Sequence, residues 1–61
     1  MTPDELVPCY AVRWQQDGRW HSTNFAVEAD AMEYRFTLPD RSAYIVSTTA
    51  ARRDVVPAMV Q

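Results

Sequence analysis

The stretch from Tyr10 to Phe25 constrains the fold most strongly, because it has the pattern of a β-hairpin. Two β-prone runs, residues 10–14 and 19–25, flank the dipeptide Asp17-Gly18. An Asp-Gly pair suits a two-residue type I′ turn, since both central positions of that turn need positive φ. The sequence therefore predicts two antiparallel strands joined at this dipeptide.

A two-residue turn also fixes which residues face each other and which share a face. The predicted pairs on the core face are Trp14 with His21, Val12 with Thr23, and Tyr10 with Phe25. The opposite face is polar apart from Trp20, and Arg13 lies diagonal to that ring, within reach of a cation–π contact. If the sheet binds nucleic acid, the expected contact residues are on this face: Arg13, Gln15, Trp20, Ser22 and Asn24.

Residues 27–38 have the composition of a helix, with acidic residues in the first turn and Pro39 at the end. At 100° per residue this helix is apolar on two opposite faces. One face, with Val27, Ala31, Tyr34 and Leu38, is expected to pack on the hairpin. The other needs cover from the C-terminal tail or from another chain. The expected protein-contact residues are therefore Ala29, Met32, Phe36, Val56 and Met59.

The remaining segments complete a small α+β domain. Pro3 and Pro8 disfavour a regular element at the N-terminus, and a β-branched, aromatic run predicts a third strand after the helix. If the helix crosses back over the hairpin, the third strand pairs beside the first. The expected fold is a ββαβ domain with a three-stranded antiparallel sheet in the order 2-1-3 and one helix on one face. Its expected segments are an arm at 1–8, the hairpin at 9–26, the helix at 27–38, the third strand at 43–50 and a tail at 51–61.

Length and composition narrow the class of protein. Sixty-one residues suffice for one domain with a small core and leave little room for a deep substrate cleft. A single cysteine, Cys9, allows no intrachain disulfide, and no run of residues has the pattern of a membrane span or a signal peptide. The sequence thus favours a cytoplasmic protein with no membrane partner. The net charge of −2 disfavours nucleic acid as a partner.

No group of residues has the spacing of a catalytic or metal site. His21 is the only histidine, and it is expected at the rim of the core, opposite Trp14. Cys9 is expected to be a buried or edge thiol, since no base is spaced to activate it. Gly18 is the sole glycine, which excludes a phosphate-cradling loop. We therefore expect no enzyme activity, no cofactor and no metal.

Residues 10–38 resemble the arm-type DNA-binding module at the N-terminus of tyrosine recombinases. The resemblance consists of an aromatic-x-Val-Arg-aromatic strand, an Asp-Gly turn, a strand ending in Phe and a helix with an acidic-Ala pair. The matching residues are Tyr10, Val12, Arg13, Trp14, Asp17, Gly18, Phe25, Asp30 and Ala31. The resemblance implies a three-stranded sheet that lies in the DNA major groove through its polar face.

Two functions remain open on this reading. The first is a small non-enzymatic interaction module, such as a bacterial or phage accessory or inhibitor protein, that binds another protein or a second copy of itself. The doubly apolar helix and the apolar tail favour it. The alternative is a DNA-binding module that uses the polar face of the sheet. Surface charge discriminates between them, because a neutral or acidic sheet face disfavours DNA.

Overall fold

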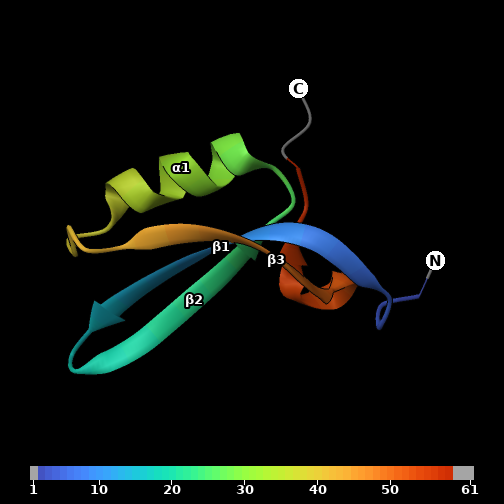
Figure 1. Cartoon of the computed structure of the whole chain (residues 1–61), viewed down its shortest axis with the longest axis horizontal. Coiled ribbons are helices and arrows are strands. Elements are labelled where there is room, and N and C mark those ends of the chain that lie inside the picture. Colours follow the sequence, from blue (N-terminus) through green and yellow to red (C-terminus); the bar gives the residue numbers. More distant parts are fainter. Residues whose placement is uncertain (1, 59–61) are drawn as a thin grey trace.

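The computed structural model describes residues 2–58 as one helix packed on a mixed four-stranded sheet (Figure 1). The elements in chain order are β1 (Leu6–Gln16), β2 (Arg19–Phe25), α1 (Glu28–Thr37), β3 (Tyr44–Ala51), the 3₁₀ turn η1 (Arg52–Asp54) and β4 (Val55–Val56). The strand order across the sheet is β3-β1-β2-β4. The α+β class is therefore confirmed, and the prediction of three strands is wrong.

The hairpin has the predicted register. Trp14 lies opposite His21, Val12 opposite Thr23 and Tyr10 opposite Phe25. Asp17 and Gly18 both have positive φ, 56° and 74°, as a type I′ turn requires. The dipeptide thus sets the pairing of the whole hairpin.

The third strand pairs antiparallel with β1, on the side away from β2. This gives the expected order 2-1-3 for the first three strands. The helix and the third strand each begin one residue later than predicted. The start of β3 lies at the same end of the molecule as the C-terminal end of α1, so the two elements run in opposite directions (Figure 1).

β1 begins at Leu6, so the expectation of no regular element across residues 1–8 is wrong for its last three residues. These pair with the end of β3, from Leu6 opposite Ala51 to Pro8 opposite Thr49. In this hairpin the N–H groups of even-numbered β1 residues point toward β2. β2 ends at Phe25, opposite Tyr10, so the N–H that proline lacks at position 8 has no strand to bond. The ladder tolerates the proline for this reason.

The fourth strand comes from the segment predicted as a tail. After η1, Val55 and Val56 pair in parallel with Asn24 and Phe25 at the end of β2. The Ala26 N–H donates to the Val56 carbonyl at 3.0 Å, and Asn24 Nδ2 donates to the Asp54 carbonyl at 3.2 Å. The tail therefore covers the β2 edge of the sheet at Asn24 and Phe25, and within residues 2–58 no strand pairs with Arg19 to Thr23 on that side.

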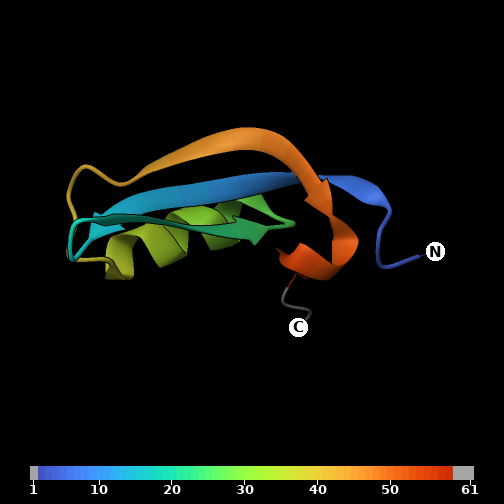
Figure 2. The ribbon, with the colours of Figure 1, turned by 90° about the horizontal axis from the view of Figure 1, so that it is seen from below.

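The core lies between α1 and one face of the sheet. Val12 and Ala31 are fully buried there beside Trp14, Phe25 and Ala43, and Tyr10, Tyr34, Leu38 and Ile45 pack around them. The Tyr34 ring lies 5.6 Å from the Trp14 ring and 5.2 Å from the Phe25 ring, centroid to centroid. Figure 2 shows α1 along one side of the sheet, and β3 bending near its end before η1. The predicted core face is confirmed.

Within residues 2–58, the helix is too short and too polar to cross a membrane.

Candidate functional site

The side of α1 that faces away from the sheet is apolar and exposed. It carries Ala29, Met32 and Phe36, which we call the outer helix face. Phe36 exposes 78% of its surface and Met32 47%, whereas Ala31, on the inner side of the same helix, is completely buried. The structure thus brings together three of the predicted protein-contact residues.

The outer helix face is tilted toward β3. Arg35 Nε donates to the carbonyl of Ala43, just before β3, at 2.8 Å. At 100° per residue Met32 and Phe36 follow Arg35 around the same side of the helix. The opposite flank carries Asp30 and Glu33, which line a hollow with Phe25 and Val56 at the β4 side. Val56 is therefore separated from the outer helix face, and Met59 lies outside the described residues.

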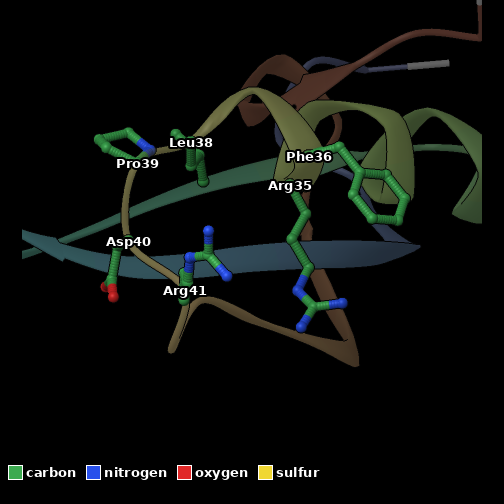
Figure 3. Close-up of a pocket in the computed structure, with 6 residues that line it drawn as sticks. All are labelled: Arg35, Phe36, Leu38, Pro39, Asp40 and Arg41. Carbon is green, nitrogen blue, oxygen red and sulfur yellow. The ribbon is translucent and has the colours of Figure 1, made fainter.

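A hollow of about 510 Å³ lies beside the outer helix face, where the helix ends and the chain turns into β3. Figure 3 shows the Arg35 and Arg41 side chains reaching into this corner, while Phe36 points away from them. The residues that line it are Arg35, Phe36, Leu38, Pro39, Asp40 and Arg41. An apolar surface thus adjoins two guanidinium groups.

The Asp40 carboxylate holds the loop at this corner in place. Oδ1 accepts from the hydroxyl and the N–H of Ser42, at 2.6 and 2.9 Å, and Oδ2 accepts from the N–H of Gln15 at 2.8 Å. These bonds lower the pKa of the Asp40 carboxyl below its ordinary value of 3.8, and the bond from the Ser42 hydroxyl contributes most to this lowering. The carboxylate therefore connects the loop that precedes β3 to Gln15 of β1.

The two edges of the sheet differ. β3 forms one edge with eight residues, Tyr-Ile-Val-Ser-Thr-Thr-Ala-Ala, none of them charged and none a proline. The other edge is formed by the two residues of β4, followed by Pro57, and by residues 19–23 of β2, which β4 does not reach. Natural sheets protect their edges with short strands, prolines and charged side chains, because an open edge can pair with another chain. The β4 side has a short strand, a proline and the charged Arg19 in the exposed part of β2, whereas the β3 edge has none of these three features.

The face of the sheet opposite the helix, which we call the open face, carries an exposed aromatic pair. Trp20 and Tyr44 meet edge to face, with ring centroids 6.2 Å apart, and expose 60% and 42% of their surfaces. They line a hollow of about 310 Å³ with Arg13, His21 and Ser22. The structure therefore brings Trp20 together with two of the predicted nucleic-acid contacts, Arg13 and Ser22.

The other two predicted nucleic-acid contacts, Gln15 and Asn24, do not line this hollow. Gln15 is the register partner of Trp20 and is exposed. Asn24 lies at the far end of β2, where its amide donates to Asp54 as part of the β4 junction. The sequence reasoning missed Tyr44, although the expected order 2-1-3 places the start of the third strand beside Arg13. The missing information was the register between these two strands, which pairs Arg13 with Tyr44.

The histidine and the cysteine, whose side chains could react or bind a metal, pack against the core or are buried. The His21 ring stacks on Trp14 at 5.5 Å, at the rim of the core as predicted. Cys9 is 1% exposed, as expected for a buried thiol. Among residues 2–58 no three His, Cys, Asp or Glu side chains gather in a way that could hold a metal ion.

Arg52 and Arg53, at the end of β3, are bound to the N-terminal segment. Arg52 pairs with Glu5 at 3.4 Å, and Arg53 pairs with Asp4. Their backbone N–H groups also donate to the carbonyls of Glu5 and Pro3, at 2.8 and 3.0 Å. These two arginines therefore join the chain end to β3.

Comparison with protein-family models, with curated proteins and with solved structures finds no match to this chain.

Proposed function

We propose that this chain is a small non-enzymatic interaction module that binds protein through the outer helix face. One observation carries the proposal: Phe36 exposes 78% of an aromatic side chain beside the half-exposed Met32, on the outer helix face that is tilted toward β3. An accessory or inhibitor protein of a bacterium or phage would act in this way. The sole cysteine cannot form an intrachain disulfide and fits a reducing compartment such as the cytoplasm.

The chemistry of this surface suits a protein partner. Aromatic side chains and methionine are enriched at the centres of protein interfaces, and arginine at their hot spots. Burying a phenylalanine side chain against a partner contributes roughly 1.5–3 kcal/mol. The neighbouring Arg35 and Arg41 would donate hydrogen bonds to a carboxylate at the rim of such a contact. The surface therefore offers an apolar anchor with a basic border.

A photo-cross-linking amino acid at position 36 tests the proposal in the cell that makes the protein. A partner bound to the outer helix face should be captured from position 36. The matched control places the same amino acid at Glu33, on the opposite flank of the same helix. Capture from position 36 and not from position 33 supports the proposal. Equal capture from both positions, or none from either, contradicts it.

The open face supports a second candidate, nucleic acid binding. On the described strands, Arg13 is the only charged side chain that the register places with the Trp20–Tyr44 pair. The acidic side chains of residues 2–58 lie on the helix, the turns and the chain ends. Exposed aromatic rings can stack on bases, and a neighbouring arginine can contact a phosphate. This face is thus weakly positive although the chain is acidic.

An amide chemical-shift titration with nucleic acid at low and at high salt tests this second candidate. Mixed-sequence duplex DNA and a single strand of the same sequence are compared. Binding at the open face should shift the Arg13, Trp20 and Tyr44 signals and should weaken as salt rises. Trp20→Ala should remove the shifts, whereas Phe36→Ala on the other side of the molecule should leave them. Unchanged spectra at low salt would exclude this function.

A further inference from the structure

The free edge of β3 presents backbone groups at known positions. Gln16 and Arg19 flank the two-residue turn and exchange both of their hydrogen bonds. Bonding alternates from there, so the odd-numbered residues of β1 face β3. The N–H of Gln15, which donates to Asp40 on the β3 side, agrees with this alternation.

The same alternation continues into β3. Tyr44, Val46 and Thr48 pair with odd-numbered β1 residues and are bonded to β1. The N–H and C=O groups of Ile45, Ser47 and Thr49 therefore point outward, to the side on which no described strand lies. An unpaired row of this kind is a template for another strand.

We propose that the partner at this edge is a second copy of the chain, whose β3 pairs antiparallel with the first about a two-fold axis at Ser47. The inference rests on the proposed function, because it names a second copy as the partner of the outer helix face. A strand added to β3 lies about 4.8 Å beyond it. That position lies on the side of the molecule toward which the outer helix face is tilted.

The sequence of β3 is complementary to itself in this register. The outward-pointing Ile45 and Thr49 pair across the axis, and Ser47 meets its own copy, which gives about six backbone hydrogen bonds. Between them, Val46 lies opposite Thr48, and the large Tyr44 lies opposite the small Ala50. Each pair keeps helix-side residues on the helix side of both sheets, because a two-fold axis perpendicular to the sheet preserves its faces.

Charge also permits a second copy at this edge. β3 carries no charged residue, so no like charges meet across the axis. Arg52 and Arg53, just beyond the strand, are already paired with Glu5 and Asp4 of their own chain. The acidic Asp30 and Glu33 lie on the far flank of the helix, and Glu28, which lies on the β3 side, shares that side with the cationic Arg35. Two copies can therefore approach through the β3 side although each has a net charge of −2.

Analytical ultracentrifugation of the purified chain from about 1 μM to about 1 mM tests the proposal. The wild-type chain should form a dimer within this range. Ser47→Lys places two ammonium groups opposite each other and should raise the dimer dissociation constant at least about tenfold. The matched control is Ser22→Lys, an exposed serine on β2 away from this edge, which should leave the dimer unchanged.

Variants with opposite charges at position 47 distinguish loss of the interface from loss of folding. Ser47→Glu alone should also be monomeric, and an equimolar mixture of Ser47→Lys and Ser47→Glu should restore the dimer. Amide hydrogen exchange adds a readout on the wild-type chain. Exchange at Ser47 and Thr49 should slow as the protein concentration rises, whereas Thr48, already bonded to β1, should be protected at every concentration.

A wild-type chain that stays monomeric up to the highest concentration overturns the proposal. A dimer that persists in Ser47→Lys also overturns it, because the copies would then meet elsewhere. Neither result removes the proposed function, since cross-linking from position 36 to a different protein would still support that function. The opposite result is also possible: no partner is captured from position 36, but Ser47→Lys weakens the dimer. The contact would then be limited to the strand edge, without the outer helix face.

Discussion

The β3 side and the β4 side of this molecule lie across the same small sheet and differ in chemistry. On the β4 side the last strand has two residues, proline follows it, and the helix above it presents Asp30 and Glu33. On the β3 side the last strand has eight uncharged residues, and the helix above it presents Met32 and Phe36. The chain therefore covers part of one edge of its sheet, at Asn24 and Phe25, and leaves the whole length of the other edge open.

This difference shows how one short helix can serve two purposes. Its inner residues, Ala31 and Tyr34, close the core. Outside the core, the flank toward β4 carries Asp30 and Glu33, and the flank toward β3 carries Glu28 and Arg35. The exposed apolar side chains of Met32 and Phe36 lie between these flanks. An amphipathic helix has one apolar face for the core. The proposed function assigns the second apolar face of this helix to a contact outside the chain.

The largest expected effect contrasts the two aromatic residues of the helix. Tyr34→Ala removes a ring packed against Trp14 and Phe25, and should lower the free energy of unfolding by about 2–3 kcal/mol. Phe36→Ala should change it by no more than about 0.5 kcal/mol, because the ring is exposed. Urea unfolding at low protein concentration measures both. Equal losses in the two variants would mean that the outer helix face is covered in solution.

A smaller effect is expected at the β4 edge. Asn24→Ala removes the side-chain hydrogen bond to the Asp54 carbonyl and should cost roughly 0.5–1 kcal/mol. Local opening should show more clearly than global stability. The N–H of Ala26, which donates to Val56, should exchange faster in the variant, whereas the N–H of Ala11, between β1 and β3, should not. Equal acceleration at both sites would show that the two edges open together.

The third effect appears only in acid and concerns the start of the β3 side. The folded-state pKa of Asp40 lies below its ordinary value of 3.8. The stabilisation from this carboxylate is therefore complete above about pH 4 and is lost as pH falls through the lower, folded-state pKa. Wild-type stability should fall relative to that of Asp40→Asn over this acid range, with no change in their difference between pH 5 and 7. Parallel curves throughout would contradict the lowered pKa.

The hairpin, its register and the place of the third strand could be predicted from the sequence, because local chemistry determines them. Asp17 and Gly18 specify one turn, and the alternation beyond them has one register that buries Trp14 and Val12. The two apolar faces of the helix follow from its periodicity in the same way. These features need no knowledge of distant contacts.

The features that sequence reasoning missed all depend on such contacts. Val55 and Val56 become a strand only because η1 brings them beside the end of β2. Pro8 enters β1 only because β2 has already ended at that level. Tyr44 joins Trp20 across the intervening β1 because of the register between β1 and β3. A short parallel pair leaves no local pattern in the sequence. Nor does the register between two strands that are neighbours in the sheet but far apart along the chain.

The buried position of Cys9 makes the chain its own kinetic reporter. This residue is opposite Thr48 in the pairing of β1 with β3, and it is the only cysteine. Because the thiol is buried, a reagent can reach it only after a local opening around it or unfolding of the whole domain. The labelling rate of the natural sequence therefore measures how often the structure around Cys9 opens, and no cysteine has to be introduced by mutation. A ligand or second copy that holds β3 in place should lower the labelling rate of Cys9.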